Sequence, residues 1–204
     1  MSLIMDTLIA IVCAYVLIKL KKPIDNFSKY WRLFFLFLGI SMFLGGFSHA
    51  FFQYTGMYGK KVTWIFAFLA GFYAGKGMLS LNVISQNTKK WLNVFLYVKF
   101  IVLLILAFYY QEFLFVTVDS ALTYLVYCLG LGLVYTKKGF PSYKYTIWGV
   151  YLLVPTIIIF IFNIQISVWF NKNDLAHLIM IGSVILFYLG VKKYEEIKVN
   201  GLNG

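Results

Sequence analysis

The sequence contains seven apolar runs, each of a length that can cross a membrane as a helix. A membrane-spanning helix needs about 20 mainly apolar residues. The runs lie at about residues 3–20, 31–54, 62–83, 91–110, 113–135, 145–166 and 174–191. They are too long and too continuous for strands of a barrel, which alternate over segments of about ten residues. We therefore predict an all-α fold, a seven-transmembrane-helix bundle in a single membrane domain, with residues 192–204 as a tail.

Charged residues are too few to cover a water-facing surface. Of all residues, 62% are hydrophobic and 12% are charged, whereas an ordinary soluble domain has about 25% charged residues. The formal net charge is +11. These charges lie at the ends of the apolar runs rather than along one face, so we predict no binding to nucleic acid. Membrane lipid is the expected surrounding and partner.

The basic residues divide unevenly between the two sets of connectors, which predicts an orientation. Cytoplasmic loops carry an excess of Lys and Arg. One set holds Lys19, Lys21, Lys22, Lys29, Arg32, Lys89, Lys90, Lys137, Lys138, Lys144, Lys192, Lys193 and Lys198, and the other set holds Lys60, Lys61 and Lys172. We predict that the richer set is cytoplasmic. The N-terminus then lies outside and the C-terminus inside, in the cytoplasmic (inner) membrane of a bacterium.

Ionisable residues inside the apolar runs are costly to bury, so each one is a functional candidate. Five of them lie in or at the runs: Asp6, His49, Asp119, Asp174 and His177. At 1.5 Å per residue, all five fall within roughly 10 Å of the predicted outer interface. The sequence therefore predicts a polar pocket in the outer leaflet.

Local spacing adds residues to this predicted pocket. In the second run, Ser41, Gly45, His49 and Gln53 are four residues apart and would share one helix face. At the seventh run, Asp174 can instead act as the N-cap of its helix. Asn163 and Asn171 supply further polar groups for a ligand near the outer ends of the last two runs.

Two lysines lie near the middle of the predicted membrane, Lys76 in the third run and Lys99 in the fourth. One interpretation is that each extends along the helix to the cytoplasmic interface. The other is that one or both face the interior and bind a carboxylate or the anionic head group of a ligand.

Two short motifs resemble a family of uncharacterised bacterial seven-helix membrane proteins. They are GGFSHAF at 45–51 and FNKNDLAH at 170–177. That family is similar, more remotely, to the alkaline ceramidases and adiponectin-receptor-like proteins. Those are zinc-dependent hydrolases with a Ser and a His on the second helix, an Asp on the third, and His-x-x-x-His on the last.

This sequence departs from the hydrolase pattern at several positions. Gly45 replaces the expected Ser, Ile181 replaces the second His of the last motif, and run 62–83 has no Asp. With two histidines, the resemblance implies at most a zinc site of His49, His177 and a carboxylate, with water as fourth ligand. That carboxylate would come from Asp174 or Asp119.

The resemblance implies an intramembrane hydrolase that acts on a lipid amide or ester. Asp119 would then be the general base, and Ser48 a further catalytic candidate. A second interpretation is a protein that binds a lipid or small ligand without turnover. A third is an accessory or structural subunit, in a homo-oligomer or a larger membrane complex. A proton-coupled transporter is least favoured, since only Lys76 and Lys99 extend the polar track inward.

Overall fold

The computed structural model describes residues 2–20, 22–167 and 170–202, and these residues are helical with short connectors. The helices are α1 (Ser2–Lys19), α2 (Asn26–Ala50), α3 (Phe52–Leu79), α4 (Gln86–Tyr110), α5 (Leu114–Leu122), η1 (Thr123–Leu131), α6 (Gly132–Lys137), α7 (Tyr143–Ile161) and α8 (Lys172–Leu202). The three elements α5, η1 and α6 follow one another without a break, and η1 is π-helical. The described residues thus form seven long helical segments and no strand, which confirms the all-α prediction.

Six of the segments are long and apolar enough to cross a membrane. By length and composition they are α2, α3, α4, the 114–137 segment, α7 and residues 172–200 of α8. In a bilayer, helices satisfy all backbone hydrogen bonds within the segment, which explains why such runs become helical. The prediction of a multi-pass helical membrane protein is confirmed at this level. The remaining segment, α1, has 18 residues and packs along α2 and α8.

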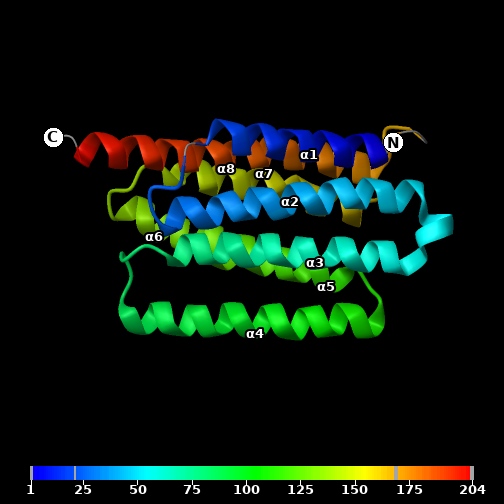
Figure 1. Ribbon diagram of the computed structural model, residues 1–204, viewed down its shortest axis with the longest axis horizontal. Coiled ribbons are helices and arrows are strands. Elements are labelled where there is room, and N and C mark those ends of the chain that lie inside the picture. The colour runs from blue at the N-terminus through cyan, green and yellow to red at the C-terminus, as the bar shows by residue number, and fades with distance from the viewer. Residues whose placement is uncertain (1, 21, 168–169, 203–204) are drawn as a thin grey trace.

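The helices lie side by side along one direction (Figure 1). In this view α2 lies between α1 and α3, and α4 lies at the far edge, where it packs against α3 and α5. The main core fills the space among the other helices with large aromatic side chains. Its largest fully buried members include Trp31, Phe34, Tyr127, Tyr135 and Phe187.

The observed helix ends differ from the predicted ones, and the physical reasons are local. α2 begins earlier than residue 31, because Asp25 caps it in a reciprocal capping box with Ser28. α3 runs through the predicted connector at 56–61, and Gly56 alone leaves helical geometry, with a φ of 53°. Glycine adopts this left-handed conformation without steric cost. The tail at 192–204 was predicted to extend the last helix, and α8 does continue as far as Leu202.

Candidate functional site

Four of the predicted polar residues come together at one end of the bundle. Asp6 lies on α1, His49 on α2, and Asp174 and His177 on α8; we call them the acid–imidazole cluster. His177 Nδ1 is 3.1 Å from Asp6 Oδ1. Asp174 interacts electrostatically with Asp6 and with His177, and His49 interacts with His177. The two histidines therefore share one site with two carboxylates, one from α1 and one from α8.

The glycine pair of the second-helix motif makes room for this cluster. A Cβ on Gly46 would lie 3.2 Å from Asp6 Cβ and 3.1 Å from Leu3 Cδ1, both tight contacts. A Cβ on Gly45 would make ordinary contacts, the nearest at 3.4 Å from Thr63 Cγ2. Gly46 thus lets α1 approach α2 closely enough to bring Asp6 to the histidines. The close neighbour of this motif is therefore α1.

The carboxylates of the cluster are buried, whereas the imidazole side chains are partly exposed on the surface of the protein. Asp6 is 3% exposed and Asp174 0%, but the His177 side chain is 20% exposed and His49 is an exposed residue. Within the described residues, Asp174 Oδ1 and His177 Nδ1 have no hydrogen-bond partner. The Asp6–His177 contact is therefore at ion-pair distance but without hydrogen-bond alignment. Buried polar atoms normally have a partner, so the hydrogen-bonding capacity of these two atoms is unused among the described residues.

The start of α8 corrects the predicted role of Asp174. Asn171 Oδ1 accepts hydrogen bonds from the backbone N–H groups of Asn173, at 2.8 Å, and Asp174, at 3.3 Å. Asp174 Oδ2 in turn accepts the backbone N–H of Asn171, at 3.0 Å. Asn171 is thus the N-cap, and Asp174 is the reciprocal partner three residues later in a capping box. This box uses the amide oxygen of Asn171, predicted to bind ligand, and leaves Asp174 Oδ1 free to face the cluster.

Asp119 does not join the histidines, contrary to the predicted arrangement. Its Oδ1 lies 2.5 Å from Lys99 Nζ, which also donates a hydrogen bond to Thr123 Oγ1 at 2.8 Å. Its Oδ2 fills the space beside Gly71 on α3, where a Cβ would lie 2.7 Å away. Asp119 and Lys99 are 1% and 4% exposed. The lysine therefore faces the interior and is paired with a carboxylate, and the acid beside His177 is Asp6 instead.

The other predicted site residues lie elsewhere. Ser48 is buried, and its Oγ is near Gly59 on α3, where a Cβ would lie 3.1 Å from it. Gln53 is exposed at the start of α3, beyond the end of α2 at Ala50, so it does not extend the face of His49. Asn163 is exposed after α7 in a left-handed conformation, with a φ of 49°. Lys76 Nζ donates to Asn93 Oδ1 at 3.0 Å, near the other end of the bundle.

The donor set does not fit the predicted zinc site. Catalytic zinc is held by three protein ligands plus water. Across the described residues, no three His, Cys, Asp or Glu side chains gather closely enough to hold a metal ion.

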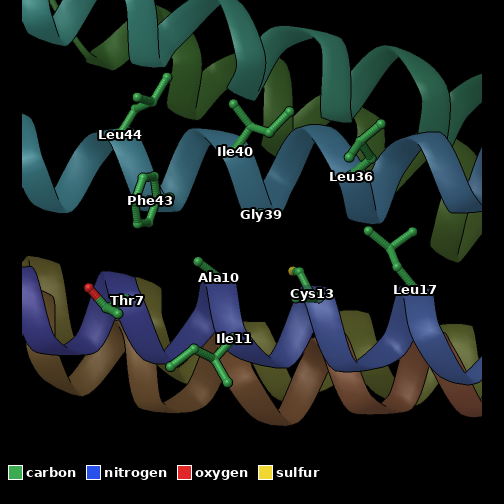
Figure 2. A pocket seen from close by; sticks show the side chains of 11 residues that line it. Thr7, Ala10, Ile11, Cys13, Leu17, Leu36, Gly39, Ile40, Phe43 and Leu44 are labelled. Carbon is green, nitrogen blue, oxygen red and sulfur yellow. The ribbon is translucent and has the colours of Figure 1, made fainter.

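An apolar groove runs along α1 and α2 from the cluster toward the middle of the bundle. Its volume is about 410 Å³. Figure 2 shows Thr7, Phe43 and Leu44 at one end and Leu17 and Leu36 at the other. Small residues open the groove in its middle: Ala10, Cys13, Ala14 and Gly39. Thr7 follows Asp6, and Leu44 precedes Gly45, so one end of the groove lies at the same level of the bundle as the acid–imidazole cluster, although no residue of the cluster lines the groove.

These features define a class, a multi-pass helical membrane protein with an acid–imidazole cluster at the end of an apolar groove. The chain belongs to a family of unknown function, DUF6962, which it matches over residues 1–196. No curated protein and no solved structure matches the chain.

Proposed function

We propose that this protein binds a single membrane lipid, with one acyl chain in the α1–α2 groove and the head group at the acid–imidazole cluster. The observation that carries the proposal is an apolar groove whose one end lies at the same level of the bundle as a polar cluster. From Thr7 to Leu17 the groove follows ten residues of helix, or about 15 Å along the helix axis. Its length and direction suit an acyl chain that lies parallel to its neighbours in a bilayer.

The cluster favours a head group with hydrogen-bond donors. Asp174 Oδ1 and His177 Nδ1 are buried and have no hydrogen-bond partner among the described residues. Asp6 adds a second carboxylate. An ammonium group or hydroxyls would satisfy them, whereas a quaternary ammonium has no N–H to donate. A hydrogen bond to a charged group contributes about 1.5–3 kcal/mol. We therefore expect ethanolamine lipids to bind at least about tenfold more tightly than choline lipids.

The experiment compares two lipids that differ in these donors. Purified protein is titrated with phosphatidylethanolamine or phosphatidylcholine of the same acyl chains, and bound lipid is counted by native mass spectrometry. We expect one ethanolamine lipid per chain and weaker retention of the choline lipid. Ala14→Trp would fill the groove and abolish retention, while Ile105→Trp, at a lipid-facing position of α4, is the matched control. Equal retention in all six combinations of protein and lipid contradicts the proposal.

A second candidate, hydrolysis of a lipid amide or ester, is favoured by the Asp6–His177 pair. In such a reaction His177 takes a proton from water, and the water oxygen adds to the carbonyl carbon. The bond to the amine or alcohol then breaks, and His177 returns the proton to that leaving group. Asp6, 3.1 Å from Nδ1, would stabilise the imidazolium. The resemblance to alkaline ceramidases is its other support.

Product analysis separates this candidate from binding alone. The protein in lipid vesicles is incubated with a ceramide and with a phospholipid, and released fatty acid is measured by mass spectrometry. Hydrolysis predicts fatty acid release that His177→Gln abolishes. Retention of lipid without any release by the unmodified protein would leave the binding proposal standing and remove the hydrolase.

The orientation is also part of the proposal. We propose seven spans, including α1, with the cluster near the outer face and the C-terminal end of α8 in the cytoplasm of a bacterium. The distribution of Lys and Arg supports it, since the end of the bundle opposite the cluster carries most of them.

A further inference from the structure

We propose a second ligand site, for a phosphate group, in a basic pocket at the end of the bundle opposite the acid–imidazole cluster. The pocket lies among the start of α2, the end of α3 and the start of α4, and its volume is about 370 Å³. The lining residues that matter to the argument are Asn26, Tyr30, Lys76, Lys89, Lys90 and Asn93. In Figure 1 these three helix ends meet on the side opposite the N-terminus.

The three lysines bring positive charge into the pocket without a carboxylate to balance it. Within the described part of the chain, no Asp or Glu lines the pocket and none forms an ion pair with Lys76, Lys89 or Lys90. The acid nearest in sequence, Asp25, is engaged by Lys198 Nζ at 2.6 Å. The pocket thus presents a net charge that an anion would neutralise.

The lysines are held in place by neutral groups, which leaves donors for a ligand. Lys76 Nζ donates to Asn93 Oδ1 at 3.0 Å, and Lys89 Nζ donates to Asn82 Oδ1 at 2.8 Å. Each ammonium carries three N–H donors. A fixed ammonium with free donors is the arrangement that binds phosphate oxygens through charge-assisted hydrogen bonds.

The rule that places lysines in cytoplasmic loops does not explain the position of Lys76. Lysines that set orientation lie in loops and at the membrane surface, as Lys90 does. Lys76 is half-buried in α3, within a span, and three residues before its end at Leu79. Its side chain can extend toward the end of the helix, and its ammonium contacts Asn93 and the ring of Tyr97 rather than a carboxylate. The pocket, the three converging lysines and the position of Lys76 together indicate a phosphate-bearing ligand.

The phosphate can belong to a lipid head group or to a soluble molecule, and the test distinguishes the two. Purified protein is unfolded by heat with phosphatidylglycerol, with phosphatidylcholine and with inorganic phosphate. A ligand at about 100 times its Kd raises the unfolding temperature by about 5–11 °C for a chain of this size. We expect that shift with phosphatidylglycerol and none with phosphatidylcholine.

Variants show whether the shift comes from the pocket. The triple variant Lys76→Gln, Lys89→Gln, Lys90→Gln should lose the shift, whereas Lys144→Gln, an exposed lysine outside the pocket, should keep it. A shift with inorganic phosphate that the triple variant also loses would assign the site to soluble phosphates. The proposal is overturned if neither phosphatidylglycerol nor inorganic phosphate raises the unfolding temperature, or if the triple variant shows the same shift as the unmodified protein. If the triple variant fails to fold, Lys76→Gln alone replaces it, with an expected loss of affinity of about tenfold.

Discussion

At the scale of single residues, Lys99 and Asp119 show how a charge is accommodated inside the bundle. Both side chains are almost fully buried and meet each other and Thr123. Gly71 gives Asp119 the space it occupies. Such a pair contributes little net stability, but removal of one partner leaves an uncompensated buried charge. The pair is therefore a sensitive point of the fold.

Lys99→Met should destabilise the protein by about 3–5 kcal/mol. The double variant Lys99→Met, Asp119→Leu should recover most of that loss, since no charge is then left unpaired. Thermal and denaturant unfolding in detergent measure the stability of the single and the double variant. Lys137→Met, at an exposed position, is the control and should change little. A double variant as unstable as the single one would show that the pair matters through something other than charge balance.

A second residue-scale prediction concerns Asp25, which lies outside the membrane spans and caps α2. Burial opposes ionisation, but the hydrogen bonds from Lys198, Tyr194 and Ser28 outweigh it and lower the pKa of Asp25 below its usual value. Its ionised form is therefore favoured by folding. The stability that it contributes is present above the unfolded pKa, about 3.9, and is lost as pH falls through the folded pKa.

Asp25→Asn should cost about 1 kcal/mol near neutral pH and remove this part of the acid dependence, because Asn still caps a helix. Asp25→Ala should cost more, since it removes the cap as well. Unfolding measured from pH 7 down to pH 3 tests both. Parallel pH profiles for Asp25→Asn and the unmodified protein would contradict the assignment.

At the scale of elements, the α1–α2 contact determines whether the acid–imidazole cluster forms. Gly46→Val would push α1 away, because a Cβ there already meets Leu3 and Asp6 closely. We expect a loss of about 1–3 kcal/mol together with loss of lipid retention. The neighbouring Gly45→Ala, which meets ordinary contacts, should stay within about 0.5 kcal/mol. Equal effects of the two substitutions in thermal unfolding would refute the role of Gly46.

At the scale of the whole molecule, the basic residues predict one orientation in the membrane. Glu112→Cys, between α4 and α5, should react with a membrane-impermeant thiol reagent in intact cells. Lys137→Cys, after the next span, should react only after the membrane is opened. The native thiols of Cys13 and Cys128 are buried, so they should contribute little background. The reverse labelling pattern would invert the proposed topology.

The sequence predicted the helices well and the site only in part. Run length and hydropathy gave each helical segment, but capping at Asp25 and the single Gly56 kink shifted several ends. His49, His177 and Asp174 were predicted to share a site, and they do interact. Asp6 was recognised as a polar residue at the same depth, yet nothing in one sequence indicated that it, rather than Asp119, would face His177.

The helical architecture followed from the sequence alone, because a chain in lipid must satisfy its backbone hydrogen bonds within each apolar run. The pairing of side chains depended on the tertiary structure. Depth in the membrane can be counted along a sequence, but the neighbours of a helix and its rotation are determined by packing. Packing placed α1 against α2 at Gly46 and also against α8, which brought Asp6 next to His177. Packing also placed α4 against α5, so that Asp119 forms its ion pair with Lys99.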